Sequence, residues 1–88
     1  MRCYFSIRSS AAWVQDPEGG EFASLAEARA EAIAIAREIL ARCLLTSDPV
    51  PWDDAVVVET PEQPLFEVSY REAAGLAPAT GASELQAR

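Results

Sequence analysis

Residues 24–44 read SLAEARAEAIAIAREILARCL, and their pattern predicts a helix from about Leu25 to Leu44. Apolar residues recur there at the i, i+3, i+4, i+7 spacing of an amphipathic helix. The predicted apolar stripe consists of Leu25, Ala28, Ala32, Ile35, Ala36, Ile39, Leu40 and Cys43. Ser24 and Glu27 form a capping-box pattern at the N-terminal end. The charged residues of the opposite side are Glu27, Glu31, Glu38 and Arg42. We therefore expect one side of this helix to pack on a sheet and the other to face water.

Two strands are predicted before the helix. Residues 3–8 alternate between apolar and polar side chains, which is typical of a half-buried strand. Residues 11–15 have the pattern of a short second strand, joined to the first by a two-serine turn. A two-residue loop pairs Phe5 with Val14, and Trp13 then lies on the opposite face of the sheet. A slip of one residue would reverse that placement, because successive side chains point to opposite faces.

Two further strands are predicted after the helix, at residues 54–60 and 65–71. The proline-rich residues 61–64 form the turn between them, and a four-residue connection pairs Thr60 with Leu65. The predicted fold class is therefore α+β: a four-stranded, mainly antiparallel sheet with one long helix on one face, in the order ββαββ. The order of the strands within the sheet is left open.

The chain is long enough for one domain. We expect a single ββαββ domain at residues 1–73 and a flexible tail at residues 74–88, because the tail is rich in small and polar residues without periodicity. No run approaches the roughly 20 apolar residues that a membrane span needs. The first residues alternate like a strand and lack the apolar core of a signal peptide, so a cytoplasmic location is expected.

The charge of the chain excludes one class of partner. The formal net charge is −7, and the seven basic residues are all arginines scattered along the sequence. A phosphate backbone would be repelled by this distribution, so we expect no nucleic-acid binding. A basic protein partner is compatible with it.

The loop at residues 16–21 is the most obvious candidate for a metal site. Asp16, Glu18 and Glu21 carry oxygen ligands of the kind that calcium prefers, but their spacing is not that of an EF-hand. The alternative, which we favour, is a turn whose acids precede a helix N-terminus. Cys3 and Cys43 are far apart and the chain has no histidine, so we predict free thiols and no metal or cofactor.

Catalytic chemistry has little support in the sequence. Asp53 and Asp54 are adjacent at the start of a predicted strand, where their side chains should diverge rather than share a cleft. There is no lysine, no histidine and no nucleophile or phosphate-binding motif. We predict that the protein is not an enzyme and has no catalytic residue; an acidic-loop enzyme is a remote alternative.

The predicted registers place four large side chains on the face away from the helix: Tyr4, Trp13, Val56 and Val58. One helix covers only one face of a sheet, and an exposed aromatic and valine patch is unfavourable for a monomer. We therefore interpret this face as an interface, most simply that of a homodimer. The alternative is that the tail or the Pro49–Trp52 loop folds over it. We interpret Trp52 itself as closing one end of the core; the alternative is that it anchors a partner.

Several short patterns together resemble a family. They are Tyr4-Phe5, Asp16-x-Glu18-Gly19-x-Glu21-Phe22, Leu25-x-x-Ala28, Glu31-Ala32 and Leu65-Phe66-x-Val68-x-Tyr70. In order and spacing they resemble a small bacterial domain family of unknown function, over about residues 2–73. The prolines of residues 61–64 depart from its usual Asp/Gly turn. The resemblance implies the fold and size but no catalytic residue.

The layout is also similar to that of acidic antitoxins of the HicB kind, which place a strand hairpin before a capped helix. The sequence thus favours a non-catalytic interaction or structural module that self-associates. The alternative is an acidic, antitoxin-like regulatory partner of a basic protein.

Overall fold

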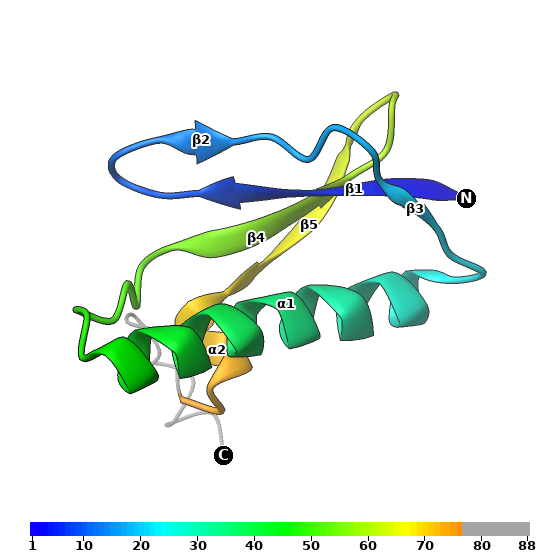
Figure 1. Ribbon diagram of the computed structural model, residues 1–88. Helices are drawn as coiled ribbons and strands as arrows, with labels where there is room; N and C mark the ends of the chain where they lie inside the picture. The colour runs from blue at the N-terminus through cyan, green and yellow to red at the C-terminus, as the bar shows by residue number, and fades with distance from the viewer. Residues whose placement is uncertain (77–88) are drawn as a thin grey trace, which may run out of the picture.

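The computed structural model describes residues 1–76 of the 88-residue chain. In chain order the elements are β1 (Arg2–Arg8), β2 (Trp13–Val14), β3 (Gly20–Glu21), α1 (Leu25–Thr46), β4 (Ala55–Glu59), β5 (Pro64–Ser69) and α2 (Tyr70–Ala73). The strands form one antiparallel sheet in the order β2-β1-β4-β5, and β3 pairs with the other end of β1. The predicted α+β class is confirmed (Figure 1). Residues 77–88 of the predicted tail lie outside the described part.

Helix α1 is defined by caps at both ends. The Ser24 hydroxyl accepts a hydrogen bond from the Glu27 N–H at 3.2 Å, and the Glu27 carboxylate accepts one from the Ala23 N–H. At the other end Ser47 adopts a left-handed conformation with φ 60°. Its N–H donates to the backbone carbonyls of Cys43 and Leu44 in the last turn of the helix. Within the described residues, no helix is both long and apolar enough to cross a membrane.

Ser47→Gly should stabilise the protein, because glycine adopts this left-handed conformation without a steric penalty. We expect a net increase of about 0.5 kcal/mol in the free energy of unfolding, after the greater freedom of glycine in the unfolded chain is subtracted. Urea titration followed by circular dichroism measures it. Ser24→Ala is the matched control at the opposite end and should cost about 1 kcal/mol. A Ser47→Gly variant less stable than the parent would contradict this description of the C-cap.

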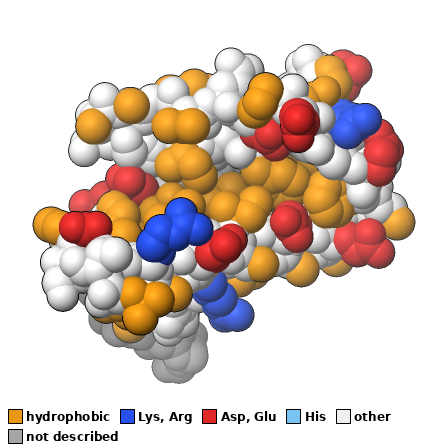
Figure 2. Space-filling view, viewed as in Figure 1, with side chains coloured by type: hydrophobic (Ala, Val, Ile, Leu, Met, Phe, Trp, Pro, Cys, Tyr) orange, Lys and Arg blue, Asp and Glu red, His pale blue; other side chains and the backbone are white. Residues whose placement is uncertain are grey.

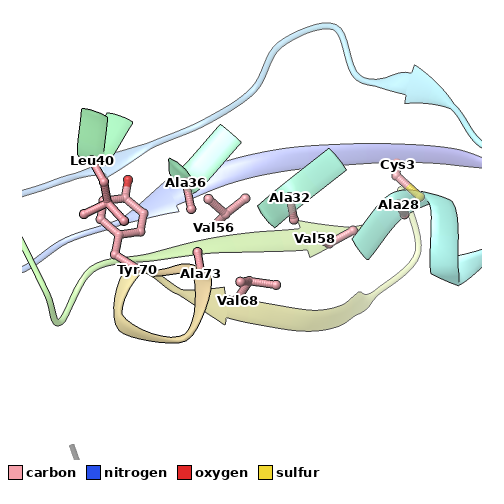
Figure 3. Packing of buried hydrophobic residues seen from close by; sticks show 10 residues of the cluster. All are labelled: Cys3, Ala28, Ala32, Ala36, Leu40, Val56, Val58, Val68, Tyr70 and Ala73. Carbon is pink, nitrogen blue, oxygen red and sulfur yellow. The ribbon is translucent and has the colours of Figure 1, made fainter. Parts of the chain in front are cut away.

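A row of small residues on α1 faces the sheet. Ala28, Ala32, Ala36 and Leu40 are buried, and Figure 3 shows this row lying over the valines of β4 and β5. Alanine side chains let the helix axis approach the sheet closely, so the core is thin and dominated by valine. The largest fully buried side chain is Tyr70, at the start of α2, which closes one end of this core. Trp52 is half-buried and packs against the same cluster, as expected.

The predicted register of the second hairpin is wrong by one residue. Val56 pairs with Val68 and Val58 with Phe66, and the pairing shifts between Val58 and Glu59. The loop between the strands is residues 60–63, which keeps the predicted four residues but lies one position before the predicted 61–64. This displacement shifts the pairing by two residues, and the irregularity then reverses one of them. Val56 and Val58 consequently face α1 and are fully buried, whereas we predicted them on the outer face. Phe66 and Val68 face the helix, as predicted.

The first hairpin differs from the prediction by two residues. Ile7 pairs with Val14 and Arg8 with Trp13, so the loop spans residues 9–12. The Ser9 hydroxyl organises this loop by accepting hydrogen bonds from the N–H groups of Ala11 and Ala12. A shift of two residues leaves every side chain on its predicted face. Trp13 therefore lies on the outer face, although its cross-strand neighbour is Arg8 rather than Ser6.

Candidate functional site

The patch predicted from the sequence is divided between two parts of the molecule. Tyr4 and Trp13 lie on the outer face; Tyr4 is half-buried and Trp13 is 49% exposed. Val56 and Val58 belong to the core beneath α1 and are unavailable to a partner. The four-residue patch is thus not a continuous surface, and the role of Tyr4 and Trp13 in an interface stays a prediction.

The outer face is largely polar where the valines were expected. Arg8 donates two hydrogen bonds to the Glu67 carboxylate, linking β1 to β5 across β4. The buried Ser6 hydroxyl donates to the Glu59 carboxylate at 3.1 Å. This polar arrangement reduces the apolar area that the outer face offers to a second molecule.

Asp16 organises the loop between β2 and β3. Its carboxylate accepts hydrogen bonds from the N–H groups of Phe5, Glu18 and Gly19, at 3.1, 3.1 and 3.3 Å. The Phe5 contact bridges the gap in β1's pairing between β2 and β3. Partial burial raises the pKa of this carboxyl, but the three backbone donors outweigh it and hold the pKa below its ordinary value. The turn role predicted for Asp16 is confirmed.

The other residues considered as catalytic or metal-binding candidates are not grouped into one site. Asp53 is exposed, and the backbone carbonyl of Asp54 accepts a hydrogen bond from the Tyr70 N–H. Burial, with the nearby Asp54 and Cys43, raises the pKa of the Tyr70 phenol. Cys3 and Cys43 are both free thiols. Among residues 1–76 no three histidine, cysteine or acidic side chains are grouped so as to hold a metal ion.

An apolar groove lies on the helix side of the sheet, between α1 and the β1–β2 hairpin. Its volume is about 430 Å³. The apolar side chains that line it are Phe5, Ile7, Val14, Phe22 and Ile35. Figure 2 shows hydrophobic side chains in the hollow between the β1–β2 hairpin and α1, with acidic and basic side chains along its borders. We call this feature the α1–β2 groove; the sequence analysis did not predict it.

The groove exists because α1 is displaced toward β5. The helix packs mainly on β4, β5 and α2, and Figure 1 shows β2 at the edge of the sheet away from the helix. Two contacts hold it on that side: Arg29 pairs with Glu72, and Arg37 donates to the Ala73 carbonyl. The β1–β2 end of the inner face is left uncovered as a result. Val14, which would be buried under a centred helix, is 58% exposed.

The groove walls are firm at one end and open at the other. Phe5 and Phe22 pack edge to face with ring centroids 5.3 Å apart. Gly19 also lines the groove, and a Cβ there would come within 2.8 Å of the Cys3 carbonyl and the Tyr4 ring. This end is therefore fixed by tight packing, whereas Val14 and Ile35 present apolar surface at the open end.

Comparison with protein families matches residues 2–71 to a domain of unknown function, DUF6894. The match covers most of the chain and all of the strands. The chain belongs to the DUF6894 family. This agrees with the family of unknown function inferred from the sequence motifs, and the match identifies no catalytic family. Comparisons of this DUF6894 chain with curated proteins and with solved structures gave no match.

Proposed function

We propose that this DUF6894 domain is a non-catalytic module that binds a segment of another protein in the α1–β2 groove. The observation that carries the proposal is the contiguous apolar surface of the groove. Val14 is 58% exposed at its open end, with Ile7 and Ile35 half-buried beside it. Exposed concave apolar surface of this kind is characteristic of docking sites in small proteins.

The polar groups of the groove favour binding over catalysis. They are the side chains of Gln15, Asp16 and Glu31. The Asp16 carboxylate already accepts three backbone hydrogen bonds and has a lowered pKa, which makes it a weak base. The proposal places the module in the cytoplasm, where free thiols such as Cys3 and Cys43 persist.

A photo-cross-linking amino acid at position 14 tests the proposal in the cells that produce the protein. We expect a discrete adduct with one partner. Ile35→Glu in the same chain should abolish that adduct, since it places a charge inside the groove. The matched control carries the cross-linker at Leu45, which is 86% exposed and is not among the groove residues. Circular dichroism must show that the double variant remains folded. An adduct that persists in the folded Ile35→Glu variant would contradict docking in the groove.

Self-association through the outer face is a second candidate, supported by the exposed indole of Trp13. Its polar surroundings and the buried Val56 and Val58 weaken it relative to the groove. Size-exclusion chromatography with light scattering tests it at tens of micromolar. In this alternative the chain is a dimer and Trp13→Ala weakens it; a monomer at that concentration contradicts it.

A further inference from the structure

The acidic side chains of the α1–β2 groove form no ion pair within the described residues, although the Asp16 carboxylate accepts three backbone hydrogen bonds. Asp16 and Glu31 line the groove, and neither forms an ion pair among residues 1–76. On the same flank of α1, only Glu38 is paired, with Arg42 at 3.6 Å. The groove therefore combines an apolar floor with negative charge at its border.

Five of the six arginines in the described chain are engaged away from the groove, and the sixth, Arg42, pairs with Glu38 on the groove's flank of α1. Arg2, Arg8 and Arg29 pair with Glu21, Glu67 and Glu72, respectively. The remaining two contacts lie on the far side or end of the fold: Arg37 donates to the Ala73 carbonyl, and Arg71 lies over the Trp52 ring at 5.8 Å. Among residues 1–76 no arginine pairs with Glu31 or Asp16, so the groove's border can accept cations from an occupant.

We propose that the occupant is a basic amphipathic helix of a partner protein; the inference rests on the proposed function of the groove. The apolar stripe of that helix lies against Ile7, Val14 and Ile35, and its flanking lysines or arginines face Glu31 and Asp16. Complementary charge of this kind raises association rates and fixes the orientation of the bound segment. It also selects against acidic competitors.

A strand is a poor alternative to a helix at this place. Strand addition needs a row of unpaired backbone groups at a sheet edge. On this side β1 is paired with β2 and β3, and its intervening Phe5 N–H donates to the Asp16 carboxylate. Strand β2 has only two residues. The groove offers side-chain surface instead, which suits anchors at i, i+3, i+4 and i+7 of a helix.

A second copy of the chain is also a poor occupant. Each chain carries a formal charge of −7. Packing two such molecules through acid-bordered grooves would bring Glu31 and Asp16 of one close to acids of the other. Like charges at an interface disfavour association unless cations separate them.

Three synthetic 18-residue helical peptides test the inference with the full chain. All share one leucine stripe, and the flanking positions carry lysine, glutamine or glutamate. We expect the lysine peptide to bind at least about tenfold more tightly than the glutamine peptide at low salt, with the difference shrinking as salt is added. The glutamate peptide should bind more weakly than both. Fluorescence anisotropy gives the Kd values, and methyl NMR shifts of Ile7, Val14 and Ile35 locate the site.

Glu31→Gln separates the charge effect from the apolar one. It should raise the Kd of the lysine peptide about threefold to tenfold and leave the Kd of the glutamine peptide unchanged. Glu62→Gln, in the exposed turn between β4 and β5, is the matched control and should change neither. Because both residues are exposed, both variants should remain folded.

The outcomes distinguish the inference from the function on which it rests. Equal binding of the lysine and glutamine peptides in the groove would overturn the basic partner and leave docking intact. Binding of neither would overturn both. If the chain self-associates and Ile35→Glu abolishes the self-association, the groove's occupant is a second copy. If Leu85→Ala shifts the methyl signals of the groove in the absence of peptide, the occupant is residues 77–88. Either result overturns the inference.

Discussion

Val58→Asp should leave the protein unfolded at room temperature, whereas Val57→Asp should leave it folded. Val58 is fully buried beneath α1, and an unpaired carboxylate there costs several kcal/mol. Small domains have only about 5–15 kcal/mol of stability, and one with so thin a core lies toward the low end. Val57 is half-buried on the outer face, so we expect its replacement to cost about 1 kcal/mol. Circular dichroism and urea titration measure both.

The pair of variants also tests the strand register. The sequence-based pairing placed Val57 beneath the helix and Val58 outside, so it predicts the opposite order of stabilities. A folded Val58→Asp protein with an unfolded Val57→Asp protein would contradict the pairing of Val58 with Phe66.

The second large effect is expected at Asp16. Asp16→Ala removes one carboxylate that accepts three backbone hydrogen bonds and leaves the Phe5 N–H without its partner. We expect a loss of about 2–3 kcal/mol in the free energy of unfolding near neutral pH. Glu18→Ala is the matched control in the same loop, because the Glu18 side chain makes no hydrogen bond within the described residues; it should change stability by less than about 0.5 kcal/mol. Equal effects of the two substitutions would contradict the role of Asp16.

The Asp16 contribution should depend on pH in one direction. Folding lowers the pKa of this carboxyl, so its stabilisation is fully present above the pKa of the unfolded chain. The stabilisation is lost as the pH falls through the lower pKa of the folded state. The stability difference between the parent protein and Asp16→Ala should therefore narrow on acidification below about pH 4. A difference that widens there would contradict a lowered pKa.

The helix and the first strand were predictable because each carries a clear period. The Ser24–Glu27 cap and the i, i+4 row of alanines identify α1, and residues 3–8 alternate cleanly. The placement of Trp13 on the outer face survived a wrong loop length because the error was two residues.

The register of β4 was not predictable from periodicity. Three consecutive valines, residues 56–58, fit either face equally well, so the pairing depended on the position of the turn. The irregularity at Val58 and Glu59 then shifted it by one residue. Helix α2 did have a local signal: Ser69 and Glu72 form the spacing of a capping box, and the Ser69 hydroxyl accepts from the Glu72 N–H.

The groove could not be predicted from the local sequence. Its apolar residues come from β1, β2, the loop before α1, and α1 itself, and each has an ordinary core pattern in its own element. Whether they meet in a closed core depends on the sideways position of α1 on the sheet. That position is set by long-range contacts, such as those of Arg29 and Arg37 with α2. The periodicity of the local sequence does not predict such contacts.

Methyl NMR with a soluble paramagnetic agent is the most direct test of an open apolar groove on the helix side of the sheet. The agent broadens methyl signals that solvent reaches. The account predicts strong broadening of Val14, intermediate broadening of Ile35, and protection of Val56 and Val58. Val14 and Ile35 signals as protected as those of Val56 would show that the groove is covered and would contradict the account.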